Sequence, residues 1–360
     1  MARFIKTLKK TALAASIASL ATVANATIVT SIKPLGFIAS SIADGVTDTE
    51  VLVPAGASPH DYSLKPSDIQ KLQGAELILW VGEDIDAFLD KTLRPMPFKK
   101  VLSIADFAEI GGLLEGEAHD HKHEHDHDHK HDHDHKHDHE HKHEHDHKHD
   151  HAHKHDHAHK HDHAHKHDHD HKHDHEHKHD HAHGHDHDHS TNWHVWYSPE
   201  ISKIVATRLA TRLTEAYPEK KEKIAQNLAE FNRTLAEQSE KIKQQLAPVK
   251  EKGFYVFHDA YSYFNNAYGL KQTGYFTINP LVAPGAKTLA KIKQEIKEHK
   301  VNCLFAEPQF TPKVIESLSK GTGVHVGRLD PMGDAVKLGV NSYANFLQYT
   351  ADSYFACLSK

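Results

Sequence analysis

Short apolar segments alternate with amphipathic segments in both halves of the chain. In the first half, this pattern predicts a strand at 27–32, a helix at 34–43, a strand at 50–53, a helix at 67–73 with Ser67 as its N-cap, a strand at 77–81, a helix at 85–93 and a strand at 100–104. The second half predicts strands at 254–257, 301–305 and 324–328, and helices at 261–268, 288–299, 312–320 and 342–358. Short buried strands separated by helices indicate mainly parallel sheets with helices on both faces.

One long helix at 218–247 is predicted to join the two halves. Pro218 suits its first turn and Pro248 ends it. Its apolar residues fall on one stripe: Ile224, Leu228, Phe231, Leu235, Ile242 and Leu246. Some 28 helical residues at 1.5 Å each make it roughly 42 Å long. The sequence therefore predicts an α/β fold of two lobes, 27–217 and 248–360, connected by a rigid helix with a cleft between the lobes.

A histidine tract interrupts the first lobe. Histidine occupies every odd position from His119 to His189, which accounts for 36 of the 41 histidines. The 35 residues between them include 10 lysines and 20 acidic residues, so the tract has a formal charge of −10. The whole chain has a formal charge of −7. It has no apolar residue larger than alanine, and we expect a disordered insert at 119–189. The remaining residues are near neutral, which argues against a nucleic-acid surface or a basic membrane patch.

The first 26 residues have the pattern of a secretory signal peptide. A basic start is followed by a short apolar run from Thr11 to Val23 and by Ala24-Asn-Ala26, an A-x-A cleavage site. The run is too short to span a bilayer, and no later segment is long and apolar enough. We therefore expect an exported protein without membrane insertion, located in the periplasm.

The two cysteines, Cys303 and Cys357, are expected to pair in an oxidising compartment. Two buried free thiols are the alternative. In the chain-entropy description, a disulfide that closes this loop contributes roughly 4 kcal/mol.

Three histidines outside the tract lie where ligands usually bind. His60 follows the strand at 50–53, His258 ends the strand at 254–257, and His194 comes just before a helix. Ligands bind at the carboxyl ends of strands in open parallel sheets. Three neutral imidazoles would suit Zn²⁺, although the chain has no HExxH or CxxC spacing. Each histidine could instead have a structural role.

Five local strings together resemble one family. They are Gly-Ala-Ser-Pro-His60-Asp-Tyr, His194-Val-Trp-Tyr-Ser-Pro, Phe-His258-Asp-Ala-Tyr, Phe-Ala-Glu307-Pro-Gln-Phe and Leu-Asp330-Pro-Met-Gly. They resemble the periplasmic zinc-binding component of high-affinity zinc ABC importers, the ZnuA type. The resemblance covers essentially the whole mature chain, and it implies that His60, His194 and His258 bind zinc between two α/β lobes. It also implies the Cys303–Cys357 disulfide.

The chain departs from some family members at the fourth zinc position. Those members have Glu before the first ligand, whereas this chain has Pro59. Water or Asp330 must then complete the shell, because related receptors use an Asp after the corresponding strand. Asp330 could alternatively be a turn residue. Glu307 could act as a general base, but its carboxylate is more simply explained as a partner of loop amides.

The resemblance implies a receptor and not an enzyme, with zinc and the membrane permease of an ABC importer as partners; we expect a monomer. His258 favours zinc over manganese, because manganese prefers oxygen ligands. A manganese or other divalent-metal receptor and a zinc hydrolase remain alternatives, as does metal storage by the tract alone. The tract is expected to hold several further zinc ions weakly, and its role as collector, buffer, pH-responsive polyelectrolyte or regulator stays open.

Overall fold

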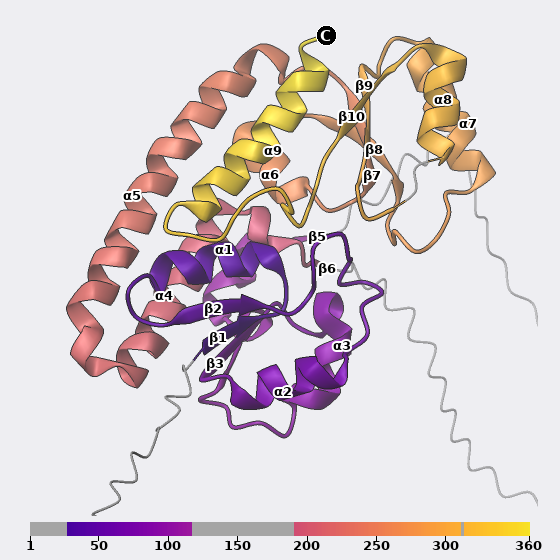
Figure 1. The fold of residues 1–360 in the computed structure, drawn as a ribbon. Helices are drawn as coiled ribbons and strands as arrows, with labels where there is room; N and C mark the ends of the chain where they lie inside the picture. The colour runs from indigo at the N-terminus through magenta and orange to yellow at the C-terminus, as the bar shows by residue number, and fades with distance from the viewer. Residues whose placement is uncertain (1–26, 117–190, 311–312) are drawn as a thin grey trace, which may run out of the picture. The chain divides into compact units, whose positions relative to one another are not determined.

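The computed structural model describes residues 27–116, 191–310 and 313–360. The predicted signal peptide at 1–26 and the insert at 119–189 lie outside the described residues. Figure 1 shows the two main sheets as separate groups of strands, with the long helix α5 running past both. No helix in the described ranges is long and apolar enough to cross a membrane.

The sheet of the first lobe has four parallel strands in the order β2-β1-β3-β4. Alternate residues of the central strands pack on opposite faces. Ile28 and Leu79 belong to the main core, whereas Val29 and Ile78 pack with Leu72 and other residues of a second cluster. This two-sided burial explains the continuous apolar run of β3. The elements are β1 (Thr27–Thr30), α1 (Lys33–Ile42), β2 (Asp48–Val51), α2 (Pro66–Gly74), β3 (Leu77–Trp80), α3 (Glu83–Leu93) and β4 (Val101–Ser103).

The expected N-cap of α2 is wrong. Pro66 occupies the first turn and Lys65 is the N-cap residue, so Ser67 lies inside the helix. Proline is favoured at the first helical position because its missing N–H would have no partner inside the helix.

The second lobe has four parallel strands in the order β10-β9-β7-β8. Its strand β8 was not predicted, because it carries polar residues and Gly274. That glycine is required by packing, since a Cβ there would lie 2.6 Å from Cε1 of Tyr255. The elements are β7 (Phe254–His258), α6 (Ser262–Tyr268), β8 (Gln272–Thr277), α7 (Ala286–Lys297), β9 (Cys303–Ala306), α8 (Lys313–Thr322), β10 (His325–Arg328) and α9 (Ser342–Leu358).

Both lobes have the same strand order when strands are counted from the first in each lobe. The second strand lies on one side of the first, and the third and fourth lie on the other. The chain therefore changes direction between the first and third strands, which are β1 and β3 in one lobe and β7 and β9 in the other. Such switch points are the usual ligand sites of open parallel sheets.

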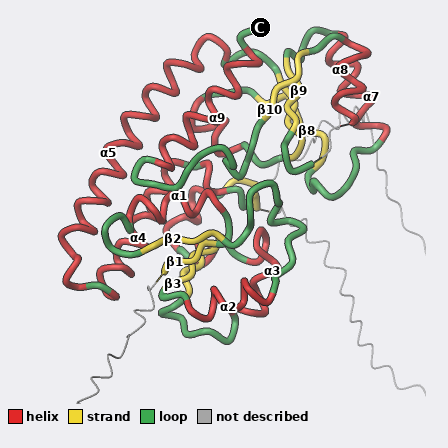
Figure 2. Tube along the Cα trace, viewed as in Figure 1, coloured by secondary structure: helices red, strands yellow, loops and turns green. Residues whose placement is uncertain are grey.

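The predicted joining helix is confirmed as α5 (Lys221–Leu246), preceded by a 3₁₀ turn at Pro218–Lys220 and by α4 (Pro199–Ala216). Figure 2 shows α5 as one uninterrupted helix with α9 beside it. All but one of the predicted stripe residues are buried, and Leu228 is partly buried. The C-terminal helix α9 also packs on α1 of the first lobe, where Ser342 Oγ donates to the Phe37 carbonyl at 3.1 Å.

A short antiparallel ribbon pairs β5 (Glu115–Gly116) with β6 (Thr191–Asn192). No sequence pattern predicted this ribbon. These four residues are the last described residues before the histidine tract and the first after it. The ribbon places Asn192 two residues before His194.

Candidate metal centre

The structure brings His60, His194 and His258 together. Nε2 of His194 lies 3.4 Å from Nε2 of His60 and 3.2 Å from Nε2 of His258. One ring nitrogen from each histidine falls within 4.8 Å of the others, which is an arrangement that could hold a metal ion. A tetrahedral zinc ion with bonds of 2.0–2.1 Å separates its ligand atoms by about 3.3 Å. The two measured separations therefore match the geometry of a zinc shell.

His258 is positioned by a buried carboxylate. It ends β7, and Glu307 follows the neighbouring strand β9, so the two side chains meet at the switch point of the second lobe. Nδ1 of His258 lies 2.8 Å from both carboxylate oxygens of Glu307, and the Tyr261 hydroxyl donates to Oε1 at 2.9 Å. The side chain of Glu307 is fully buried. The expectation that Glu307 binds loop amides is wrong, because its carboxylate faces His258 and Tyr261.

His194 is positioned by a neutral acceptor. Its Nδ1 lies 2.7 Å from Oδ1 of Asn192, which also accepts from the His194 backbone N–H at 3.1 Å. The other end of the Asn192 amide donates to the Asp259 carbonyl at 2.8 Å and to the Ser262 hydroxyl at 3.2 Å. One buried side chain therefore orients His194 and also connects it to the residue that follows His258.

These contacts decide which nitrogens can bind a cation. Asn192 Oδ1 and the Glu307 carboxylate accept hydrogen bonds, so the ring proton of His194 and that of His258 lie on Nδ1. The two Nε2 atoms, which are not occupied by these acceptors, face each other across 3.2 Å. A metal ion can bind both of them, and the carboxylate–histidine–metal arrangement of His258 is typical of zinc sites.

His60 comes from a loop and not from a strand or helix. It lies in the turn after β2, and its backbone N–H donates to Ser58 Oγ at 3.3 Å. Within the described part of the chain, no side chain hydrogen-bonds Nδ1 of its ring. Burial, and then the neighbouring His258, lower the pKa of His60 to about 3. Burial also holds the pKa of His194 well below its ordinary value, so both rings are neutral and able to bind metal near pH 7.

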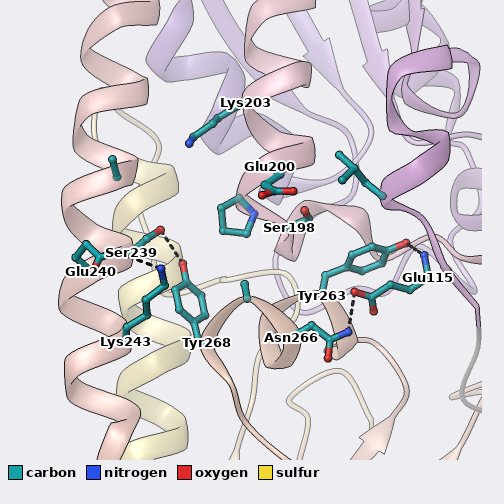
Figure 3. Close-up of a pocket in the computed structure, with 14 residues that line it drawn as sticks. Glu115, Ser198, Glu200, Lys203, Ser239, Glu240, Lys243, Tyr263, Asn266 and Tyr268 are labelled. Atoms are coloured by element: carbon teal, nitrogen blue, oxygen red, sulfur yellow. Dashed lines mark hydrogen bonds and ion pairs between the residues drawn. The ribbon is translucent and has the colours of Figure 1, made fainter.

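The cavity at the three histidines is small. Its volume is about 10 Å³, and its wall includes Trp196, Gln309, Phe310 and Met332 beside the histidines. That volume is on the order of one water-sized probe, which suits a single ion. A larger cavity of about 530 Å³ lies where α4, α5, α6 and β5 meet, and none of the predicted site residues lines it (Figure 3).

Asp330 is not brought into the histidine group. Its Oδ1 accepts hydrogen bonds from Gln309 Nε2 at 2.8 Å and from the Met332 backbone N–H at 3.0 Å. Its Oδ2 accepts from the Asp334 backbone N–H at 2.7 Å. Both carboxylate oxygens of Asp330 therefore already accept hydrogen bonds. These contacts fit the alternative interpretation of Asp330 as a turn residue.

Comparison with known proteins agrees with this arrangement. Residues 28–357 match the model of the family described as the periplasmic component A of the zinc-uptake complex, ZnuA. The chain belongs to the ZnuA family.

Two curated relatives have the same family name. The high-affinity zinc uptake system protein ZnuA of Haemophilus influenzae is 66% identical over 99% of both chains. The protein of the same name from Haemophilus ducreyi is 51% identical over 98% of this chain and 99% of the relative. A solved ZnuA structure, 20% identical, covers 92% of this chain and 99% of its own with a TM-score of 0.64, and supports the fold.

Family membership confirms the expectation of a solute-binding receptor rather than an enzyme. The sequence did not reveal the roles of two positioning residues of this ZnuA-family site, Asn192 and Glu307. Asn192 lies next to the tract and has no distinctive motif, so only the ribbon reveals its role. Glu307 was noticed, but its distance of 49 positions from His258 concealed the contact. The adjacency of their strands was the one signal that could have linked them.

Proposed function

We propose that this protein captures Zn²⁺ with His60, His194 and His258 and delivers it to the permease of an ABC importer. The observation that carries the proposal is the convergence of the three histidines, with Nε2 of His194 and Nε2 of His258 3.2 Å apart in a buried cavity. The names of the ZnuA relatives support zinc uptake as the purpose of this site.

Zinc is favoured over manganese because the three converging ligand atoms are nitrogens. Manganese prefers carboxylate, carbonyl and water oxygens, whereas imidazole suits zinc. A zinc hydrolase would need space for a substrate, and the cavity of about 10 Å³ does not offer it. Glu307 is also unsuited to act as a general base, since His258 and Tyr261 occupy its oxygens.

The remaining assignments belong to the same proposal. We assign 1–26 to a signal peptide cleaved after about Ala26, 27–217 to the first lobe, 218–247 to the joining helix and 248–360 to the second lobe. The protein acts as a periplasmic monomer, and the metal site lies between the lobes. The tract at 119–189 binds several further zinc ions more weakly than the three-histidine site, because ordering a chain around each ion costs entropy.

The test is a chelator competition titration of His60→Ala, His194→Ala and His258→Ala in the full chain. Zinc is buffered at concentrations where only the tightest site fills. Each variant is expected to bind zinc more than about 100-fold more weakly, because losing a side chain that binds the ion directly costs more than the usual 10–100-fold loss for a residue that only hydrogen-bonds such a side chain. His325→Ala is the matched control, since His325 is exposed on β10. Unchanged affinity in His194→Ala and His258→Ala would refute the site.

A further inference from the structure

A buried oxygen atom in the wall of the metal cavity lacks a hydrogen-bond donor. Gln309 lies two residues after Glu307 and lines the same cavity as the three histidines. Its Oε1 is buried and has no hydrogen-bond partner among the residues that the structure describes. Buried polar atoms are nearly always paired, so an unpaired one beside a metal cavity points to a bound group that donates to it.

The orientation of the Gln309 amide follows from its other end. Nε2 donates to Asp330 Oδ1 at 2.8 Å, and a carboxylate can only accept. The amide nitrogen must therefore face Asp330, and Oε1 is the free end. Asp330 is itself held by the backbone N–H groups of Met332 and Asp334. The loop after β10 thus fixes the side chain that presents the unpaired oxygen.

We propose that Gln309 Oε1 accepts a hydrogen bond from the water molecule that completes the zinc shell. This inference rests on the proposed function, in which three imidazoles leave the fourth tetrahedral position open. A zinc-bound water is a strong donor, and Pro59 provides no side-chain acceptor. Asp330 then acts through Gln309 as a positioning residue and not as a ligand.

The arrangement also suits a protein that must release its ion. A fourth ligand that is solvent can exchange, whereas a fourth protein side chain would close the shell, as in structural zinc sites. Gln309 stabilises the solvent ligand by an outer hydrogen bond, which strengthens binding without adding a protein–metal bond. Partners of this kind typically change metal affinity 10–100-fold.

The experiment compares Gln309→Met with Gln70→Met in the full chain, with zinc buffered by a competing chelator so that only the tightest site fills. Methionine keeps the length of the side chain and removes the amide. Gln70 is exposed on α2 and controls for the substitution itself. Gln309→Met should weaken zinc binding about tenfold and shift the visible absorption bands of the Co²⁺-loaded protein, while Gln70→Met changes neither.

A double-mutant cycle with Asp330→Ala separates the two roles of Asp330. If Asp330 acts through Gln309, Asp330→Ala weakens zinc binding in the parent but adds less than twofold to Gln309→Met. Equal losses in both backgrounds would show that Asp330 acts independently of Gln309 and would overturn the inference. Zinc affinity and Co²⁺ bands of Gln309→Met that match the parent would also overturn it, while His258→Ala still tests the proposed function separately.

Discussion

The switch points of the two lobes lie at the same place in each sheet, between the first and third strands. The side chains at the two switch points have different partners. Between β7 and β9, His258 and Glu307 face each other and His258 directs its free nitrogen into the metal cavity. Between β1 and β3, the buried Asp86 closes the equivalent position by accepting from Ser31 Oγ at 2.7 Å and from the Val81 backbone N–H at 2.8 Å. Each sheet therefore offers a position where a metal ligand could stand, and the side chains decide which of the two positions faces the metal cavity.

The two buried carboxyl groups also differ in their partners. Glu307 faces an imidazole that a metal ion would make more acidic, so its charge is useful there. Asp86 has two neutral donors, and its Oδ1 has no hydrogen-bond partner within the described ranges. Burial raises the pKa of Asp86 to about 7, and its hydrogen bonds from Ser31 and Val81 offset part of this rise. Glu307 therefore positions a residue of the metal site, whereas Asp86 connects the ends of β1 and β3 by hydrogen bonds.

The largest expected effect concerns the covalent link of the second lobe. The structure contains the expected disulfide between Cys303 of β9 and Cys357 of α9, and no described residue of the first lobe has one. Replacing both cysteines by alanine should lower the free energy of unfolding by about 2–5 kcal/mol, measured by urea denaturation. Thiol titration of the denatured, non-reduced parent should find no free sulfhydryl. Two reactive thiols in that titration would show that the lobes do not differ in this way.

The next effect tests the functional carboxylate. Glu307→Gln should weaken zinc binding 10–100-fold, about 1.4–2.7 kcal/mol, because the amide keeps the size but removes the charge beside His258. Asp86→Asn is the matched control at the other switch point and should leave zinc affinity unchanged. Chelator competition measures both variants. This ranking places Glu307 above Asp330, the reverse of what sequence alone suggested, and a larger loss in Asp330→Ala would contradict it.

The third effect concerns how the stability contributed by the buried Asp86 changes with pH. The pKa of Asp86 is about 7 in the folded state and 3.8 in its ordinary environment, so the folded protein binds more protons between these values. The stabilisation from this group is present below about pH 4 and is lost as the pH rises through 7. Raising the pH from 5 to 8 should therefore cost the metal-free parent roughly 1–3 kcal/mol more than it costs Asp86→Asn.

The difference between parent and Asp86→Asn is the quantity to measure, by urea unfolding at both pH values. His60 and His194 have lowered pKa values and give the opposite slope, since protons favour their unfolded forms, but they contribute equally to both proteins. Parallel pH profiles would show that Asp86 is not a buried neutral acid near pH 5.

The smallest effect is expected from removing the tract. Deleting 119–189 leaves the ribbon between β5 and β6 and removes no apolar residue larger than alanine. The melting temperature of the metal-free protein should stay within a few degrees, while metal analysis by mass should fall to one zinc per chain. A large loss of thermal stability would show that the first lobe depends on the tract.

The sequence by itself determined most of the helices and strands and the ligand types, although it did not predict β8 or the ribbon of β5 and β6. Apolar runs such as Leu77–Trp80 are typical of strands covered on both faces, and the stripe on α5 is typical of a helix packed along its length. These patterns are local, because they depend on spacings of two to four residues. The three histidines were identified because strand ends and family motifs are also read locally.

Tertiary structure alone decided how the histidines are held. Glu307 is 49 residues from His258, and the loop that carries Asp330 fixes Gln309 from 21 residues away. Such contacts depend on which strands are adjacent and which loop folds over them, and no periodicity in the chain encodes that choice. The sequence identified the three histidines, and the packing of the two sheets and their loops brought their ring nitrogens together.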